Sequence, residues 1–488
     1  MSVNWAIKEI GAALRAGETT AREVTQASLD RIAEVDDRLG AFLVTTPELA
    51  LAAAEAAETA IASGTAGPLA GIPLAIKDVL CLRDVETTAG SKMLAGFLPP
   101  YTATTVQRAL DAGAVPIGKT NCDEFAMGSS NENSAYGPVH NPWDLARVPG
   151  GSSGGSAVAV ASGEATVALA SDTGGSIRQP AALTGVVGLK PTYGRTSRYG
   201  LIAFASSLDH VGTFSRTVAD SAVVLEAIAG HDPLDSTSSP RPVEGVAAGL
   251  TNGVAGLKLG VPREYFVDGM EAGVESAVRA AIGQLEKEGA ELVEISLPHT
   301  SYGVAVYYIL APAEASSNLA RMDGVRFGHS APEAPTVVAQ YLQAREEGFG
   351  AEVKRRIMIG TYALSSGYYD AYYVKAQKAR TLVKQDFDEA FKAVDAIVCA
   401  TSPTVAFEIG AKAHDPLAMY LNDVLTIPAD LAGIPAISVP CGFSDGLPVG
   451  LQVMGPSWRE DVVLRVAAAY ESLNDWGSRP PTALAGAA

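Results

Sequence analysis

Residues 150–156 read Gly-Gly-Ser-Ser-Gly-Gly-Ser, and residues 172–178 read Asp-Thr-Gly-Gly-Ser-Ile-Arg, before the chain reaches Gly-Leu-Lys-Pro at 188–191. Glycine lets the backbone bend where other residues cannot, and such turns direct bare N–H groups toward a ligand. A serine in a turn of this kind is typical of a nucleophile beside an anion-stabilising pocket. No histidine lies between the two turns, so a hydrolase built on them needs another base.

Lys77 is the candidate base, because it ends the apolar run Pro-Leu-Ala-Ile at 73–76. Such a run predicts a strand, and a lysine at its end is expected to be partly buried. Burial disfavours the ammonium form and lowers the pKa of the amine, which then can accept a proton. The alternative is a lysine whose stem is covered while its charged head reaches solvent.

Composition indicates a globular chain rather than a disordered one. The 488 residues are 48% hydrophobic and 18% charged, and 54 acids against 36 bases leave a formal net charge of −18. An acidic surface repels phosphate backbones, so we do not expect this chain to bind nucleic acid alone, although a basic partner could supply that function. Four scattered cysteines without a CxxC spacing and six unclustered histidines predict a reducing compartment and no metal site.

The N-terminus lacks the basic-then-apolar order of a signal peptide, and no apolar run reaches membrane-spanning length. We therefore expect a cytoplasmic protein that does not enter a membrane. Along the chain, short apolar runs alternate with helical patterns, which predicts an α/β layered sheet. The predicted strands are 73–79, 114–119, 167–171, 258–261 and 396–400, and the predicted helices include 20–62, 104–112 and 274–288.

Two other stretches have distinctive composition. Residues 231–253 are rich in Pro, Ser, Gly and Asp and predict an exposed loop. Residues 337–393 are mostly of helical type and carry a cluster of five tyrosines, for which packing between helix faces is the favoured interpretation. These tyrosines are Tyr362, Tyr368, Tyr369, Tyr372 and Tyr373.

The segment from Gly113 to Thr120 matches the phosphate-binding P-loop pattern letter for letter. A P-loop follows a strand and opens a helix. Here a helical pattern precedes the segment, and Val-Pro-Ile occupies the place of the flexible cradle. We therefore interpret these residues as a strand and do not expect ATP to bind there.

Gly151, Ser153 and Gly155 satisfy the G-x-S-x-G pattern of the nucleophile elbow in α/β-hydrolases. That motif requires a strand before the serine and then an acid and a histidine downstream. The residues before Ser153 have loop composition instead. The downstream histidines, which lie in no persuasive context, are His299, His329 and His414. This alternative is disfavoured.

Lys77 together with the segments 150–156 and 172–178 resembles the motif of the amidase signature enzymes, which use a Ser–cis-Ser–Lys triad. The two serines lie 24 residues apart, as that family requires. The resemblance implies that Ser176 is the nucleophile, that Ser152 is the bridging serine and that Lys77 is the base. It also implies an α/β amidase-signature fold, with a central mixed β-sheet covered by helices on both faces.

The same resemblance implies a cis peptide bond between Gly151 and Ser152. It further implies an oxyanion hole formed by consecutive backbone N–H groups of the second turn. These belong to Thr173, Gly174, Gly175 and Ser176. We expect one domain over residues 1–488, because no clear linker divides the chain. Its expected parts are N-terminal helices at 1–65, a signature core at about 66–215, a helical elaboration at about 300–395 and a flexible tail at 477–488.

Within that superfamily, the chain resembles the A subunits of the glutamyl-tRNA(Gln) amidotransferases over nearly its whole length. The stretches that carry this resemblance are 121–128, 141–144, 198–209, 360–370 and 420–428. It implies that Arg356 pairs with the α-carboxylate of glutamine, that Asp423 pairs with its α-ammonium and that Tyr307 lines the same pocket. On the residues alone, an ordinary surface or helix-pairing role is the favoured interpretation of each.

The resemblance implies a glutaminase subunit that passes ammonia to a partner, which converts Glu-tRNA(Gln) to Gln-tRNA(Gln) with ATP and Mg²⁺. It implies a heterotrimer with subunits B and C, misacylated tRNA bound mainly by the partner, and no cofactor in this chain. In some organisms the same kind of complex converts Asp-tRNA(Asn). Two alternatives stay open: a free-standing amidase acting on small amides, and a non-catalytic assembly protein.

Overall fold

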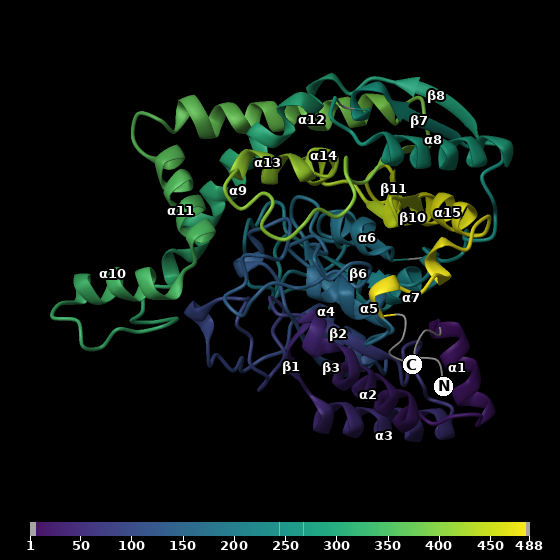
Figure 1. Cartoon of the computed structure of the whole chain (residues 1–488), viewed down its shortest axis with the longest axis horizontal. Coiled ribbons are helices and arrows are strands. Elements are labelled where there is room, and N and C mark those ends of the chain that lie inside the picture. The colour runs from purple at the N-terminus through teal and green to yellow at the C-terminus, as the bar shows by residue number, and fades with distance from the viewer. Residues whose placement is uncertain (1–5, 244, 267, 485–488) are drawn as a thin grey trace.

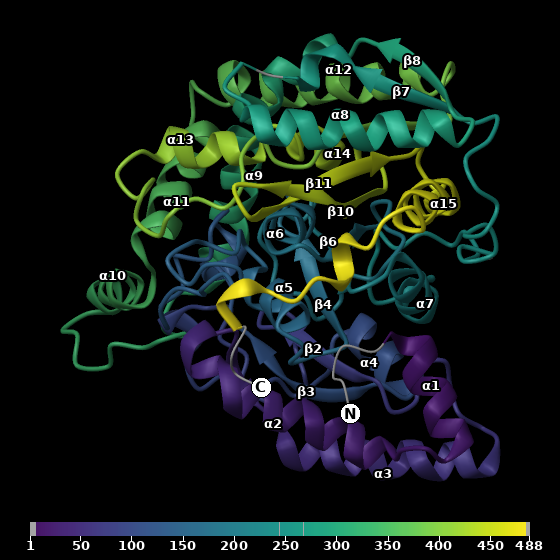
Figure 2. The same cartoon turned by 45° about the vertical axis from the view of Figure 1, so that its right-hand side comes forward.

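One mixed β-sheet of eleven strands forms the centre of the computed structural model, which describes residues 6–243, 245–266 and 268–484. The strands lie in the order β1-β3-β2-β4-β6-β5-β10-β11-β9-β7-β8. Helices flank the sheet (Figures 1 and 2), which confirms the predicted fold class. The strands are β1 (Phe42–Thr45), β2 (Pro73–Lys77), β3 (Val115–Thr120), β4 (Val167–Asp172), β5 (Val187–Lys190), β6 (His210–Ser215), β7 (Lys258–Pro262), β8 (Glu291–Ile295), β9 (Ala396–Ala400), β10 (Ala436–Ser444) and β11 (Leu447–Met454).

The helices are α1 (Ile7–Ala16), α2 (Ala21–Leu39), α3 (Pro47–Ser63), α4 (Thr104–Asp111), α5 (Gly154–Ala161), α6 (Arg178–Thr184), α7 (Val218–Ile228), α8 (Ala272–Lys287), α9 (Gly303–Asn318), α10 (Val337–Gly348), α11 (Ala351–Leu364), α12 (Lys375–Ala390), α13 (Pro416–Tyr420), α14 (Ile427–Ala432) and α15 (Glu460–Glu471). Helices α1 to α3 lie at one end of the sheet, and α8 and α12 lie at the other, near β7 and β8 (Figure 2). Between them, α5 and α6 are entirely buried. They follow the two glycine turns.

The sheet topology brings the candidate residues together. Strands β2 and β4 are parallel neighbours, with Ile76 beside Leu169. The carboxyl ends of parallel neighbours meet at one edge of a sheet, and this is where an α/β sheet forms its sites. Lys77 therefore lies beside the turn that follows Asp172. All five predicted strands are present. Val115–Thr120 of the P-loop pattern form β3, where the amine of Lys119 pairs with Asp78 at 2.8 Å.

The helix predicted over 20–62 is wrong in its middle. Gly40 adopts a left-handed conformation with φ 65° and ends α2. Residues Phe42–Thr45 then pair antiparallel with β3 as β1, before α3 begins at Pro47. Pairing with a distant strand decides this segment, and the local alanine-rich pattern does not reveal it.

The interpretation that the five tyrosines pack between helix faces is also wrong. Helix α10 and the adjoining end of α11 project from the body of the molecule (Figure 1). At the end of α11 and just beyond it, the rings of Tyr362 and Tyr368 lie with centroids 4.3 Å apart, and those of Tyr369 and Tyr373 lie 5.2 Å apart. Four of the five rings are more than a third exposed. The aromatic side chains contact one another at the corner between α11 and α12 instead of filling the space between helix faces.

Residues 231–253 form neither helix nor a strand of the sheet in their described part, as predicted. Of the tail expected to be flexible, 477–484 form short turns, in which Ala483 N donates to Pro142 O at 3.2 Å, and 485–488 lie outside the described residues. The single-domain organisation and its internal bounds stay predictions. Among the helices of the described ranges, none combines the length and apolar character needed to cross a bilayer.

Candidate active site

Lys77 is fully buried at the end of β2, and three serine hydroxyls surround its amine. The Nζ atom lies 2.8 Å from Ser152 Oγ, 2.8 Å from Ser153 Oγ and 2.9 Å from Ser171 Oγ. Burial lowers the pKa of Lys77 to about 8, against the opposing influence of nearby carboxylates such as Asp123. A neutral amine donates two hydrogen bonds and accepts one, so it can take a proton from a neighbouring hydroxyl.

The loop that carries Ser152 is held from two sides. The peptide bond between Gly151 and Ser152 is cis, as the resemblance implies. Gly151 N donates to Gln179 Oε1 at 3.0 Å, and Asp123 N donates to Ser152 O at 3.2 Å. A Cβ atom on Gly151 would lie 2.1 Å from Asp123 Oδ2, so only glycine fits this close approach. These contacts hold the Ser152 backbone beside Lys77.

Ser176 lies in the turn between β4 and α6 and is 8% exposed. Its hydroxyl makes no hydrogen bond to another residue in the described part of the chain, so Ser152 and Ser176 are not directly hydrogen-bonded. The structure thus brings Lys77 and Ser152 into contact and leaves the Ser176 hydroxyl available. Contacts between catalytic groups commonly tighten when a substrate binds.

A buried ion pair shapes the Ser176 turn. Asp172 Oδ1 accepts a hydrogen bond from Gly175 N at 2.8 Å, and Oδ2 accepts one from Ile177 N at 3.1 Å. The guanidinium of Arg178 reaches both Asp172, at 3.1 Å, and Asp430, at 2.5 Å. Burial by itself raises the pKa of Asp172, but the Arg178 guanidinium outweighs it and holds that pKa below its usual range. The carboxylate therefore stays charged and organises the turn.

The predicted oxyanion donors separate into two groups. The N–H groups of Gly174 and Ser176 have no hydrogen-bond partner among residues 6–243, 245–266 and 268–484. The N–H of Gly175 donates to Asp172 at 2.8 Å, and its place in the oxyanion hole stays a prediction. Gly175 also provides the φ of 136° that the turn requires. The hydroxyl of Thr173 donates to Asp209 at 2.8 Å, and its N–H stays a predicted donor.

Arg356 lies on α11, only 2% exposed, although it carries a permanent charge. Its Nε donates to Glu352 Oε1 at 2.8 Å, and Tyr420 Oη donates to the same oxygen at 2.9 Å. The rings of Tyr308, Tyr420 and Phe204 lie 5.1–5.7 Å from the guanidinium carbon. Within the described residues, neither Nη group makes a hydrogen bond. The guanidinium is thus held through Nε, and its two Nη groups are free to donate hydrogen bonds to a bound carboxylate.

Asp423 lies nearby in a 3₁₀ turn at Leu421–Asp423. Its Oδ2 accepts a hydrogen bond from the Ser129 hydroxyl, whereas Oδ1 is buried and has no partner among the described residues. Burial raises the pKa of Asp423 to about 7. Buried carboxylate oxygens are normally satisfied, so an unpaired one marks a place for a cationic ligand.

Tyr307 and Thr426 both contact the Ser176 turn. A Cβ atom on Gly174 would lie 2.7 Å from the Tyr307 ring, so the ring lies directly against the turn. Thr426 Oγ1 donates to Gly174 O at 2.7 Å and lies 3.1 Å from Asp423 O. The structure therefore places Asp423 and Tyr307 next to the candidate nucleophile.

Several contributing residues escaped prediction from the sequence. Glu352 precedes Arg356 by one helical turn, a spacing that could have indicated the pair. Ser171 ends a predicted strand parallel to that of Lys77, which is a weaker signal. The remaining residues come from distant segments, and no sequence signal indicated them. They are Ser129, Phe204, Tyr308 and Tyr420. In the described ranges, no three or more His, Cys, Asp or Glu side chains are arranged to hold a metal ion.

Comparison with known proteins agrees with this geometry. The Amidase family model matches residues 23–464. The chain is also 61% identical over 470 residues to the A subunit of the glutamyl-tRNA(Gln) amidotransferase from Chloroflexus aggregans, covering 96% of each chain. The chain belongs to the amidase family, among the glutamyl-tRNA(Gln) amidotransferase A subunits. The predicted family is confirmed.

Solved structures extend the amidase relationship. A crystal structure of the A subunit of the glutamyl-tRNA(Gln) amidotransferase from Thermotoga maritima superposes with a TM-score of 0.82 at 43% identity, covering 99% of this chain and 98% of that one. The peptide amidase of Stenotrophomonas maltophilia superposes with a TM-score of 0.83 at 34% identity, covering 98% of both chains. The amidase-signature fold is thus shared by enzymes with different substrates.

Proposed function

We propose that this chain is the glutamine-hydrolysing subunit of a tRNA-dependent amidotransferase. One observation carries the choice of substrate: Arg356 has Nη groups and Asp423 has an Oδ1 that are unpaired within the described residues, and both side chains lie near the Ser176 turn. Asp423 reaches that turn through Thr426, and Arg356 reaches it through Phe204 and Tyr307. A buried cation and a buried anion together suit the α-carboxylate and α-ammonium of an amino acid. The amide of glutamine can then reach Ser176.

The chemistry begins with attack of Ser176 Oγ on the side-chain amide carbon of glutamine. Ser152 takes the proton from Ser176 and gives its own to neutral Lys77, 2.8 Å away. The free N–H groups of Gly174 and Ser176 stabilise the oxyanion of the tetrahedral intermediate. The proton then returns through Ser152 to the nitrogen of the leaving group, the C–N bond breaks, and ammonia departs from a γ-glutamyl ester on Ser176.

Water completes the cycle. It attacks the ester carbonyl and loses its proton through Ser152 to Lys77, and the same proton restores the Ser176 hydroxyl as glutamate leaves. Proton transfer by a positioned group of this kind typically contributes about 10²–10⁴-fold to the rate. In this chemistry the described residues need no cofactor of their own.

The ammonia is passed to a partner subunit, which converts Glu-tRNA(Gln) to Gln-tRNA(Gln) with ATP and Mg²⁺ bound on that partner. The names of the relatives support this assignment, and so does the net charge of −18, because an acidic chain leaves tRNA binding mainly to the partner. We propose a cytoplasmic heterotrimer with subunits B and C. We propose the conversion of Asp-tRNA(Asn) to Asn-tRNA(Asn) as a second reaction of the same complex.

The test measures ammonia released by the complex purified from the native host. Glutamine is compared with an apolar amide of similar length. Preference for glutamine supports the proposal, whereas preference for the apolar amide favours a free-standing amidase. Failure of the chain to co-purify with a tRNA-amidating activity would also contradict the proposed function.

A further inference from the structure

The segment from Asp123 to Ser129 touches both halves of the site. On one side, Asp123 N holds the Ser152 carbonyl at 3.2 Å. At its other end, the hydroxyl of Ser129 donates to Asp423. Glu124 lies between these contacts and takes no part in the chemistry proposed above. Its side chain is nevertheless buried, with only 2% exposed. Burial of a carboxylate costs free energy unless hydrogen bonds compensate for the lost water.

Those hydrogen bonds lead to the helix that carries Arg356. Glu124 Oε2 accepts a hydrogen bond from Gly350 N at 2.8 Å, and Oε1 accepts one from Ser91 Oγ at 2.5 Å. A Cβ atom on Gly350 would lie 2.4 Å from Oε2, so the carboxylate requires glycine there. Gly350 is the residue immediately before α11. Glu124 therefore fixes the position of the first turn of that helix.

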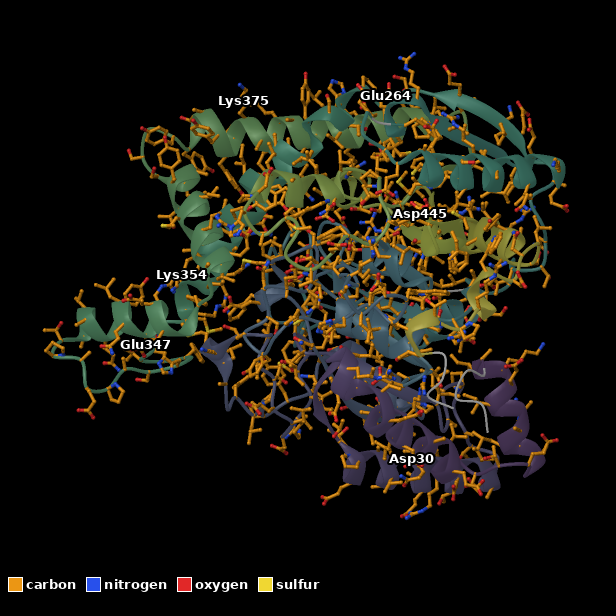
Figure 3. All side chains as sticks on the ribbon, viewed as in Figure 1. Asp30, Glu264, Glu347, Lys354, Lys375 and Asp445 are labelled. Carbon is orange, nitrogen blue, oxygen red and sulfur yellow. The ribbon has the colours of Figure 1, made fainter. Side chains whose placement is uncertain are left out.

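Glu124 holds the first turn of α11, whereas the later turns pack against α9, where a Cβ atom on Gly360 would lie 1.9 Å from Pro312 O. Together with α10, α11 lies at the outer side of the molecule, where Figure 3 labels Glu347 and Lys354. Arg356 follows Gly350 by six residues, or about 9 Å along the helix axis. A small tilt at the start of α11 thus displaces the guanidinium relative to Ser176.

We propose that Glu124 is a positioning residue for substrate binding, because it ties the start of the Arg356 helix to the loop that supports Ser152. This inference rests on the proposed function. It states that Glu124 sets the distance and orientation of the Arg356 guanidinium relative to the Ser176 hydroxyl. It predicts that loss of the Glu124 contacts weakens glutamine binding more than it slows the chemical step.

The contacts also identify a conservative variant. In Glu124→Gln, the amide oxygen still accepts from Gly350 N, and the amide nitrogen donates to Ser91 Oγ. The Ser91 hydroxyl can then donate to Gly348 O, which already lies 3.2 Å away. Glu124→Ala removes both acceptors, so the Gly350 N–H and the Ser91 hydroxyl lose their bonds to residue 124.

A matched control anchors a different helix. Asp220 is also 2% exposed, and its Oδ1 accepts a hydrogen bond from Ile7 N at 3.0 Å, at the start of α1. Helix α1 lies at the far end of the molecule from α11 (Figure 1). Asp220→Ala therefore removes a comparable buried carboxylate without touching the candidate pocket.

The experiment measures kcat and KM for glutamine in the complex carrying each variant. Glu124→Ala should raise KM about tenfold with kcat changed less than about threefold, as loss of ground-state binding predicts. Glu124→Gln should restore KM to within about threefold of the wild type, and Asp220→Ala should leave it unchanged.

An unchanged KM in Glu124→Ala, or a fall in kcat alone, would overturn the inference. If that variant does not fold, Ser91→Ala removes one of the two contacts and should still raise KM about threefold; no rise would count equally against the inference. A wild-type complex that does not hydrolyse glutamine would instead refute the proposed function itself.

Discussion

Replacing Lys77 by methionine tests whether a neutral amine is buried beside Ser152. The pKa of Lys77 falls from the usual 10.5 to about 8 because the site is fully buried. Since a tenfold change in proton affinity equals about 1.4 kcal/mol, burying this lysine costs about 3 kcal/mol at pH 7. In the window between pH 8 and 10.5 the unfolded chain binds more protons than the folded one, so folding stability rises with pH.

Methionine has no such pH dependence. The free energy of unfolding of wild type minus that of Lys77→Met should therefore increase by about 2 kcal/mol from pH 7 to 9.5. The hydroxyls that lose their partner in the variant contribute equally at every pH, so they cancel from this trend. Parallel urea unfolding of the two proteins at a series of pH values measures it. A difference that stays constant with pH would refute the buried neutral amine and with it the proposed base.

The remaining predictions concern activity. The glutaminase kcat/KM should rise about tenfold from pH 7 to 9, because a base of pKa about 8 is mostly protonated at the lower pH and neutral at the higher; a flat profile would remove Lys77 as the base. Ser176→Ala should abolish ammonia release from glutamine and leave ammonia-dependent tRNA amidation by the assembled complex intact, whereas loss of both activities would indicate a structural defect. Arg356→Ala should raise KM for glutamine roughly 10–100-fold, the equivalent of one lost hydrogen bond to a charged group, and unchanged kinetics would take Arg356 out of the pocket.

The local patterns were sufficient for much of the fold. Five strands with strong apolar runs lie where the periodicity predicted them, because a buried strand in an α/β sheet must be apolar on both faces. Strand β1 was missed because Phe42–Thr45 becomes a strand only by pairing with β3, more than seventy residues away. The exposed tyrosines were misjudged because residues 362–373 lie at a corner that no periodic pattern marks.

Residue types and spacing alone selected Lys77 and the two glycine-serine turns as the place of the chemistry, since bending backbone, hydroxyl and amine are each required there. The chain order of these groups could not say which hydroxyls surround the amine, that Gly175 N–H is already engaged by Asp172, or that Arg356 is enclosed by three aromatic rings. The hydrogen bond between Gly175 and Asp172 spans three residues and depends on the conformation of the turn, whereas Lys77 and its serine partners lie 75–94 residues apart and meet only when the sheet is assembled. Packing, and not local sequence, sets the burial and the distances on which the pKa of Lys77 and the shape of the pocket depend.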